Sequence, residues 1–473
     1  MNEKRRVYLL ENKKLNPETI AVTFAKTSRS PQSFDQIAQE LSDEKSAQFH
    51  ERWVVGYGHA SVAEHAVLHI AVENISRLAV ECLESNRLAA YTEKSSRYQV
   101  WGADCFFIPD EIKGSMLEDV YCDTVRTLFQ KYAKALPVLQ ATIQNKYSAD
   151  RNVLSEKDIH TRCMDVCRYY LPAAATANVG ITINARSLEH ALRKMLSHPL
   201  AEVRQVGHEI KQVAISHLPI LIKYVDEVAY LKQAEERTTQ LNTALPPHAK
   251  DENWCTLVDF DEQFETHILS ALMLRYGQVG FKEIEKNLQN SSDEKKQILL
   301  DVLFRKLDAH DTPLRELEYS NFIFDLLMDQ GAYFEFKRHR MMTQTVQPLS
   351  PYHGYAIPKL ISESGLELDF IEAMDIAKKT YLKIAATLPS AASYVIPNAY
   401  NRRVLASFNL RTAIHFTTLR TAPNAHFAIR RVANRMAEVI RNRMDLFKPF
   451  FYAQPNETWQ YIESEFFTDP IRF

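Results

Sequence analysis

The chain of 473 residues contains an internal repeat, and this repeat restricts the folds available to it. A proline, an asparagine, an arginine and a histidine stand at identical offsets in both halves, at Pro172, Asn184, Arg186 and His190 and again at Pro397, Asn409, Arg411 and His415. A second spacing nearly repeats, with twenty-three residues from Glu64 to Arg87 and twenty-two from Glu318 to Arg340. We therefore predict two fused copies of one α+β domain, at 1–231 and 255–473, joined by a polar, proline-bearing linker at 232–254.

Composition places the chain among ordinary globular proteins. It is 46% hydrophobic and 25% charged, which is enough to bury a large core. No apolar run reaches the length of a membrane span, and the first residues, Met-Asn-Glu-Lys-Arg-Arg, lack the apolar segment of a secretory signal. The six cysteines show neither a pairing pattern nor a zinc-ligand pattern. These features predict a cytoplasmic protein that does not bind membranes.

Hydrophobic periodicity predicts a similar order of elements in the two halves. Strands are expected at 16–30 and 66–73, and the second half has an apolar run at 322–328. Helices are expected at 34–54, 76–86, 115–147, 156–170, 200–224, 261–276, 279–289, 294–308 and 367–387.

Arg338, His339 and Arg340 place two permanent cations and an imidazole directly after an apolar, aromatic run. Guanidinium groups bind phosphate and carboxylate oxygens through paired N–H bonds, so such a group favours an anionic ligand. From Arg402 to Arg441 there are eight arginines, no lysine and one acid. The second half is therefore predicted to bind a polyanion, large or small. A solvated arginine-rich turn is the simpler alternative for the Arg-His-Arg segment.

A metal site is the alternative reading of two histidines in the first half. His65 and His69 are four residues apart and follow Glu64, but no third ligand stands at a suitable spacing. We expect these histidines to be structural and expect no metal.

Several segments together resemble one family, the flavin-dependent thymidylate synthases. In the first half they are His59 to His65, Glu93-Lys-Ser95-Ser96-Arg97-Tyr98 and Asn184 to His190; in the second they are Arg338-His339-Arg340, Arg403, Asn409 to His415 and Arg420. The resemblance covers most of both halves, and it implies two tandem copies of that family's α+β fold.

Each half departs from the family pattern in a different place. The first half has Ser85-Asn86-Arg87 where the family has Arg-His-Arg, and Met195 where the family has a later arginine. The second half has no Glu-x-Ser-x-Arg segment after Thr343. Because the losses are complementary, we hypothesise one composite active site to which both halves contribute.

The resemblance implies the reaction and the residue roles. The reaction is the reductive methylation of dUMP to dTMP, with FAD as cofactor and with methylenetetrahydrofolate and NADPH as co-substrates. Arg420 is the expected catalytic residue, because a fixed cation beside the N3 and O4 edge of uracil stabilises the ring anion as it forms. The 5′-phosphate is assigned to Arg97, Ser95 and Ser96, assisted by Arg403. The implied substrate-binding residues are Glu93, Ser95, Ser96, Arg97, Arg338 and Arg403, and the implied FAD-binding residues are Arg338, His339, Arg340, Asn409, Arg411 and His415.

Some alternatives stay open at this point. Asn184, Arg186 and His190 either bind a second FAD or are relics, and Arg411 and His415 could instead pair with core carboxylates. Glu335 brings a negative charge to a position where the family often has a polar nucleotide contact, which leaves room for another pyrimidine nucleotide or another transferred group. A non-catalytic protein that binds nucleotides or nucleic acid is a third possibility, and we expect nucleic acid less than a small nucleotide. Because the family is tetrameric, we expect a homodimer that forms a pseudo-tetramer of domains.

Overall fold

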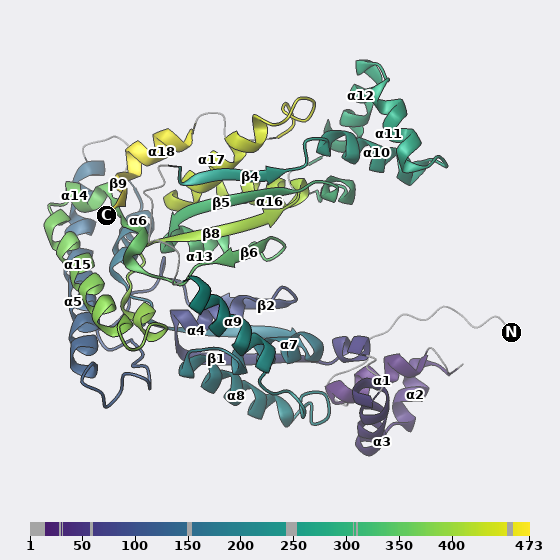
Figure 1. Cartoon of the computed structure of the whole chain (residues 1–473), viewed down its shortest axis with the longest axis horizontal. Helices are drawn as coiled ribbons and strands as arrows, with labels where there is room; N and C mark the ends of the chain where they lie inside the picture. Colours follow the sequence, from purple (N-terminus) through teal and green to yellow (C-terminus); the bar gives the residue numbers. More distant parts are fainter. Residues whose placement is uncertain are drawn as a thin grey trace. The chain divides into compact units, whose positions relative to one another are not determined.

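The computed structural model describes residues 15–27, 30, 32–56, 60–148, 154–242, 253–305, 307–308, 311–451 and 457–473 (Figure 1). The chain forms two compact units that interleave along the sequence. Unit 1 contains Met1–Ser95, Cys105–Glu118 and Ala174–Pro247, and unit 2 contains Ser96–Asp104, Asp119–Ala173 and His248–Phe473. The segment with Arg97 and the first-copy residues from Asp119 to Ala173 therefore belong to unit 2. The boundaries predicted at 231 and 255 describe the repeat in the sequence and remain a prediction.

Unit 1 is built on a three-stranded antiparallel sheet in the order β1-β3-β2, with β1 at Val67–Ser76, β2 at Ala89–Glu93 and β3 at Thr176–Asn184. Leu68, Ile70 and Val72 are buried while the residues between them are exposed, as a period of two requires. The other elements of unit 1 are α1 (Pro17–Thr27), α2 (Phe34–Glu40), α3 (Asp43–Phe49), a π-helix (His50–Gly56), a 3-10 turn (Ala60–His65), α4 (Arg77–Glu84), α7 (Ala185–Leu196), α8 (Ala201–Ile215) and α9 (Ala229–Asn242).

Unit 2 is built on a four-stranded antiparallel sheet in the order β4-β5-β8-β6, with β4 at Cys255–Phe260, β5 at Phe322–Asp329, β6 at Thr343–Val346 and β8 at Asn401–Phe408. Helix α17 (Phe427–Arg441) packs against β4 and β5, and α13 (Gln330–Phe336) and α16 (Leu410–Arg420) pack against α17. The core of this layer includes the buried side chains of Phe322, Phe324 and Phe408.

The remaining elements of unit 2 include long helices from both copies. Helices α5 (Glu118–Ser148, in unit 2 from Asp119) and α6 (Glu156–Cys167) come from the first copy, and α5 meets α15 (Glu367–Ala385) through a 2.7 Å hydrogen bond between the hydroxyls of Thr124 and Thr380. The others are α10 (Phe264–Tyr276), α11 (Phe281–Gln289), α12 (Asp293–Leu300), a 3-10 turn (Arg315–Glu318), β7 (Tyr355–Pro358), α14 (Lys359–Glu363), α18 (Trp459–Phe466) and β9 (Phe467–Arg472).

The internal structures of the two sheets confirm the repeat. Strand β2 pairs with β3 through Ala90 and Thr182, and β6 pairs with β8 through the corresponding residues Thr343 and Ser407. One difference is a bulge in β1 between Val72 and Ile75, which contains Asn74 at a φ of 58°. A bulge adds one residue to a strand, and β5 pairs with β8 without one, so the bulge accounts for the one-residue difference between the two spacings noted in the sequence.

Equivalent residues of the two copies also pair with each other inside unit 2. Pro172 and Pro397 form an antiparallel bridge. The amide of Ala173 donates to the carbonyl of Ile396, and the amide of Asn398 donates to the carbonyl of Leu171, both at 3.0 Å. These two bonds are related by the repeat, so the copies meet at this point as the two partners of a symmetric contact do.

Most of the predicted elements are confirmed, and one is wrong. The strand predicted at 16–30 is helix α1, because Pro17 occupies the first helical position and the Asn16 side chain accepts a 2.7 Å hydrogen bond from the Thr19 amide. The helix predicted at 34–54 is interrupted at Leu41. Within the predicted linker, residues 232–242 continue α9, and 243–252 lie outside the described residues. In the described part of the chain, every helix is too short or too polar to cross a membrane.

Candidate functional site

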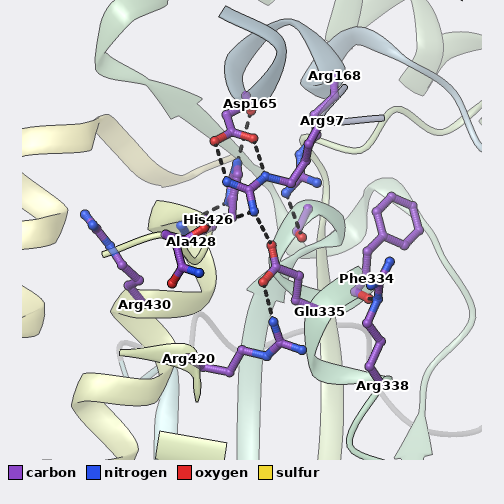
Figure 2. Close-up of polar contacts among 12 residues, drawn as sticks. Arg97, Asp165, Arg168, Phe334, Glu335, Arg338, Arg420, His426, Ala428 and Arg430 are labelled. Carbon is purple, nitrogen blue, oxygen red and sulfur yellow. Dashed lines mark hydrogen bonds and ion pairs between the residues drawn. The ribbon is translucent and has the colours of Figure 1, made fainter. Parts of the chain in front are cut away.

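The polar centre of unit 2 is the carboxylate of Glu335, on α13. Asp329 caps this helix by accepting a 2.9 Å hydrogen bond from the Ala332 amide, which fixes the helix at the end of β5. The Glu335 side chain is only 8% exposed. Nη1 of Arg420, the last residue of α16, donates to Glu335 Oε2 at 2.8 Å, and Nη1 of Arg97 lies 3.6 Å from Oε1. Figure 2 shows Glu335 between these two guanidinium groups.

Asp165 on α6 holds the other side of Arg97. Nε and Nη2 of Arg97 donate to the two carboxylate oxygens of Asp165 at 2.6 and 2.9 Å. This is a paired contact of the kind that guanidinium geometry favours. Burial lowers the pKa of Arg97, but the hydrogen bond and charge of Asp165 and the charge of Glu335 raise it more, so the net shift is upward. Arg97 is therefore a fixed cation with a defined orientation.

His426, at the start of α17, holds the backbone of Asp165. Its Nε2 donates to the Asp165 carbonyl at 3.1 Å, and its Nδ1 accepts from the Ala428 amide at 3.2 Å, as Figure 2 shows. Burial and the nearby cations Arg168 and Arg97 lower the pKa of His426 well below its usual value. The imidazole is therefore neutral and joins α6 to the first turn of α17.

His339 contacts Arg420 on the side of the cluster away from Asp165. Nε of Arg420 donates to His339 Nε2 at 2.9 Å, and the His339 ring lies 5.8 Å from the ring of His415. Burial, together with the charges of Arg420, His415 and Arg338, lowers the pKa of His339 to about 3. The imidazole is therefore neutral at physiological pH, and because Nε2 accepts, its proton is on Nδ1.

Arg420 remains a cation in this setting. Burial lowers its pKa, Glu335 opposes that shift, and a guanidinium stays protonated throughout the physiological range. Within the described residues its Nε and Nη1 are the nitrogens with hydrogen-bond partners, which leaves the Nη2 hydrogens available for a ligand. The arrangement can stabilise negative charge that develops on a bound ring.

The structure places the residues expected to bind the cofactor in two groups. Arg338 is exposed, Arg340 is half-buried and His415 is exposed. Arg338 and His415 lie beside His339, and their exposed flank is the open side of the cluster. Asn409 caps α16 by accepting from the Thr412 amide at 2.9 Å, and Arg411 pairs with Glu318 at 2.7 Å and donates to the Pro313 carbonyl. Asn409 and Arg411 thus have structural contacts of their own, and their role toward FAD stays a prediction.

Arg403 lies apart from the cluster. It forms a 2.7 Å ion pair with Asp325, whereas its neighbour Arg402 is buried and stacks on the ring of Tyr333 in α13. Adjacent residues of a strand face opposite sides of the sheet, so Arg403 points away from the α13 side. Its expected contact with a phosphate also stays a prediction.

The residues predicted from the first copy divide between the units. Ser96, which is buried, and Arg97 lie in unit 2, whereas Glu93 and Ser95 lie in unit 1, where Glu93 pairs with Arg77. Asn184 caps α7, Arg186 pairs with Glu64, and His190 is exposed in unit 1. His59 lies outside the described residues.

Two residues of the cluster were missed in the sequence. Asp165 is an acid inside the apolar segment Cys-Met-Asp-Val-Cys, a position where burial without a partner costs several kcal/mol, on the order of 5. That anomaly was a signal that Asp165 has a cation partner. His426 carried no comparable signal, because its neighbours in the sequence fit an ordinary helix start.

These observations define a duplicated α+β protein with an arginine-rich polar site in its second unit. A family model described as "Thymidylate synthase complementing protein" matches residues 9–220 and 256–444. The chain belongs to this family and carries its domain twice, which confirms the resemblance to flavin-dependent thymidylate synthases and the tandem α+β fold.

The relatives fall into two groups, which differ in how much of this chain they match. A "UPF0159 protein" of Chlamydia muridarum is 29% identical over 432 residues, covering 87% of this chain and 82% of the relative. Another UPF0159 protein, of Thermoplasma acidophilum, is 25% identical over 440 residues, covering 85% and 88%. A "Flavin-dependent thymidylate synthase" of Clostridium tetani is 28% identical over 211 residues, covering 44% of this chain and 82% of the relative. The chain is thus similar over most of its length to the UPF0159 proteins and over 44% of its length to a flavin-dependent thymidylate synthase.

Proposed function

We propose that this protein is a flavin-dependent thymidylate synthase with one composite site, and that it converts dUMP to dTMP. The observation that carries the proposal is the cluster in unit 2: Arg97, from the first copy's Glu-x-Ser-x-Arg segment, and Arg420, from the second copy, both contact Glu335. Each copy lacks a family segment that the other copy keeps, so a complete site needs residues of both copies. Arg97 and Arg420 both belong to unit 2.

In this proposal the protein binds and polarises the nucleotide. Arg97 and Ser96 bind the 5′-phosphate, and Arg420 faces the N3 and O4 edge of the ring. As electron density builds at C5, the fixed cation of Arg420 stabilises the charge on that edge. His339 keeps Arg420 oriented through the 2.9 Å hydrogen bond to Nε.

FAD fits the residues on the open side of the cluster. Arg338, Arg340 and His415 offer guanidinium and imidazole N–H groups to an anionic cofactor, with Arg338 and His415 exposed to receive it. FAD, when bound, supplies the redox chemistry, with NADPH as reductant and methylenetetrahydrofolate as carbon donor.

A coupled assay tests the proposal. The purified protein should show flavin absorbance and should oxidise NADPH in a dUMP-dependent manner once methylenetetrahydrofolate is supplied. Arg97→Ala and Arg420→Ala should each abolish turnover with an unchanged far-UV circular dichroism spectrum, whereas Arg435→Ala, which loses only a pair with Glu438 and a stack on Trp459, should retain it. Full activity of the Arg97 and Arg420 variants would refute the composite site.

Two other functions are distinguished by the same preparation. A flavin enzyme acting on another pyrimidine nucleotide, or transferring another group, is favoured by the two carboxylates beside Arg97, and it would oxidise NADPH with a nucleotide other than dUMP. A nucleic-acid-binding protein would be colourless and would bind DNA or RNA in a salt-sensitive manner. The burial of Arg402, Arg430 and Arg431 argues against that reading of the arginine-rich segment.

The expected assembly is a homodimer with two complete nucleotide sites. Light scattering of the purified protein checks this expectation, and a monomeric mass would contradict it.

A further inference from the structure

Tyr169 of the first copy contacts the second copy at three points within unit 2. It lies in a 3-10 turn (Arg168–Tyr170) that directly continues α6, and it is fully buried. Its hydroxyl donates to Asp329 Oδ1 at 3.1 Å, and its carbonyl accepts from the Ala399 amide at 3.2 Å. Its ring is stacked against the ring of His426, with the two centroids 6.0 Å apart. The end of α6 is therefore fixed against the second copy.

The Tyr169 hydroxyl reaches the same oxygen that caps α13. Asp329 Oδ1 also accepts from the Ala332 amide, in the first turn of that helix. Burial and the charge of Asp329 raise the pKa of Tyr169 well above its usual value, so the hydroxyl keeps its proton and is the donor. One carboxylate oxygen thus receives one donor from the first copy and one from α13 of the second copy. The hydrogen bond holds α13 against the end of α6.

These two helices carry the groups on the two sides of the composite site. Asp165, four residues before Tyr169, orients Arg97 through both of its carboxylate oxygens. Helix α13 carries Glu335, which pairs with Arg420. The distance between the two guanidinium groups therefore depends on where α6 lies relative to α13. Under the proposed function, on which this inference rests, Arg97 binds the phosphate and Arg420 faces the ring, so that distance has to match the length of the nucleotide.

We propose that Tyr169 is a positioning residue of the composite site, and that its hydrogen bond to Asp329 sets the place of Arg97 relative to Arg420. In this role Tyr169 acts through Arg97 and does not itself contact the nucleotide. Arg420 and its partner His339 both come from the second copy, so their hydrogen bond does not depend on α6. Loss of the Tyr169 hydroxyl should therefore weaken binding of the phosphate and leave binding of the ring unchanged.

Titration of the FAD-saturated protein with dUMP and with deoxyuridine, which lacks the phosphate, tests this role through the flavin absorbance. Tyr169→Phe removes one hydroxyl and keeps the ring. It should weaken dUMP binding about 10-fold and change deoxyuridine binding less than about twofold, because one hydrogen bond to a charged group is lost. Tyr170→Phe is the matched control and should bind both ligands as the wild type does, because Tyr170 is equally buried and its hydroxyl has no hydrogen-bond partner among the described residues. Asp329→Asn keeps the cap of α13 but removes the charge from the acceptor, and it should weaken dUMP binding about threefold even if Tyr169→Phe fails to fold.

The outcomes separate this role from the proposed function. Equal dUMP affinity in Tyr169→Phe and Tyr170→Phe would overturn the positioning role and leave nucleotide binding intact. An equal loss for dUMP and deoxyuridine in Tyr169→Phe would also overturn it, because the hydroxyl would then serve the fold as a whole. Failure of the wild-type protein to bind either ligand would overturn both the positioning role and the proposed function.

Discussion

The two copies place different chemistry at the same positions of the same fold. Glu335 and His339 stand six and ten residues after the cap of α13, and Arg420 stands eleven after the cap of α16. The residues of unit 1 at those positions, counted from the caps of α4 and α7, are Cys82, Asn86 and Met195. An acid, an imidazole and a guanidinium in unit 2 thus correspond to a thiol, an amide and a thioether in unit 1.

The region in unit 1 is closed and largely apolar. Met195 is fully buried, and with Leu83, Ile183 and Leu192 it lines a small apolar cavity. Burial raises the pKa of the Cys82 thiol to about 11. Lys194 donates to Asn86 Oδ1 at 2.9 Å, which fixes that amide. Among the described residues, the unit 1 positions that correspond to Glu335, His339 and Arg420 therefore carry uncharged side chains, and the region stabilises unit 1.

What the copies share is the scaffold around these positions. Each has an asparagine cap on the helix after its central strand, and each has an arginine two residues later that pairs with a glutamate of a 3-10 turn: Arg186 with Glu64, and Arg411 with Glu318. Under the proposed function, both domains have to fold, but one complete site per chain is enough. Exchanging residues between the copies tests whether the unit 2 residues serve the proposed site and the unit 1 residues serve stability.

The largest effect on turnover is expected when Arg420 of unit 2 is replaced by methionine, the residue at the equivalent position 195 of unit 1. Arg420→Met should lower turnover about 1,000-fold or more, because the fixed cation that faces the ring is lost. Steady-state kinetics with dUMP and NADPH measures the loss. Leu419→Met, at an exposed neighbouring position, is the matched control. Wild-type rates in Arg420→Met would show that the arginine of unit 2 and the methionine of unit 1 do not differ in function.

The reverse exchange should damage unit 1 without creating a site. Met195→Arg places a guanidinium among apolar side chains with no carboxylate at the position of Glu335, so it should reduce the free energy of unfolding by about 3 kcal/mol or more. Urea denaturation measures this change. A stable variant that binds a second dUMP per chain would show instead that unit 1 keeps a usable site.

Acid should weaken unit 2 through His339. Its pKa is about 3 in the folded chain and about 6.5 when unfolded. Between these values the unfolded chain binds more protons, so stability is complete above about pH 6.5 and falls as the pH is lowered. From pH 7 to pH 5 the loss from this residue should be about 2 kcal/mol.

His339→Asn, which installs the residue found in unit 1, should remove that share of the pH dependence. Thermal unfolding at a series of pH values measures it, and the groups that face His339 are Arg420, His415 and Arg338. Because the buried His426 and the half-buried His198 also have lowered pKa values, a smaller dependence should remain. An unchanged slope would contradict the assignment of a neutral His339.

The smallest effect should be equal in both copies. Asn184→Ala and Asn409→Ala each remove a side-chain cap from the first turn of a helix, at 2.9 Å in both cases, and each should cost about 1 kcal/mol of stability. Denaturant unfolding of the two variants gives the comparison. A much larger loss of flavin binding for Asn409→Ala would show that this asparagine also contacts the cofactor.

The sequence alone determined the duplication and the arginines that carry the proposed chemistry. These features can be read along the chain, since a repeat depends on spacing and the arginines stand in short motifs. It also misassigned 16–30 as a strand, because β-branched residues there outweighed the proline and asparagine that start α1.

Only the tertiary structure decided the environment of those arginines. Arg97 meets Asp165 across 68 positions and shares Glu335 with Arg420, which is more than 300 positions further along the chain. No spacing rule links such residues, because their separation in the fold depends on how α6, α13 and α16 pack. The sequence could name the cations of the site, whereas the partners that orient them are products of packing.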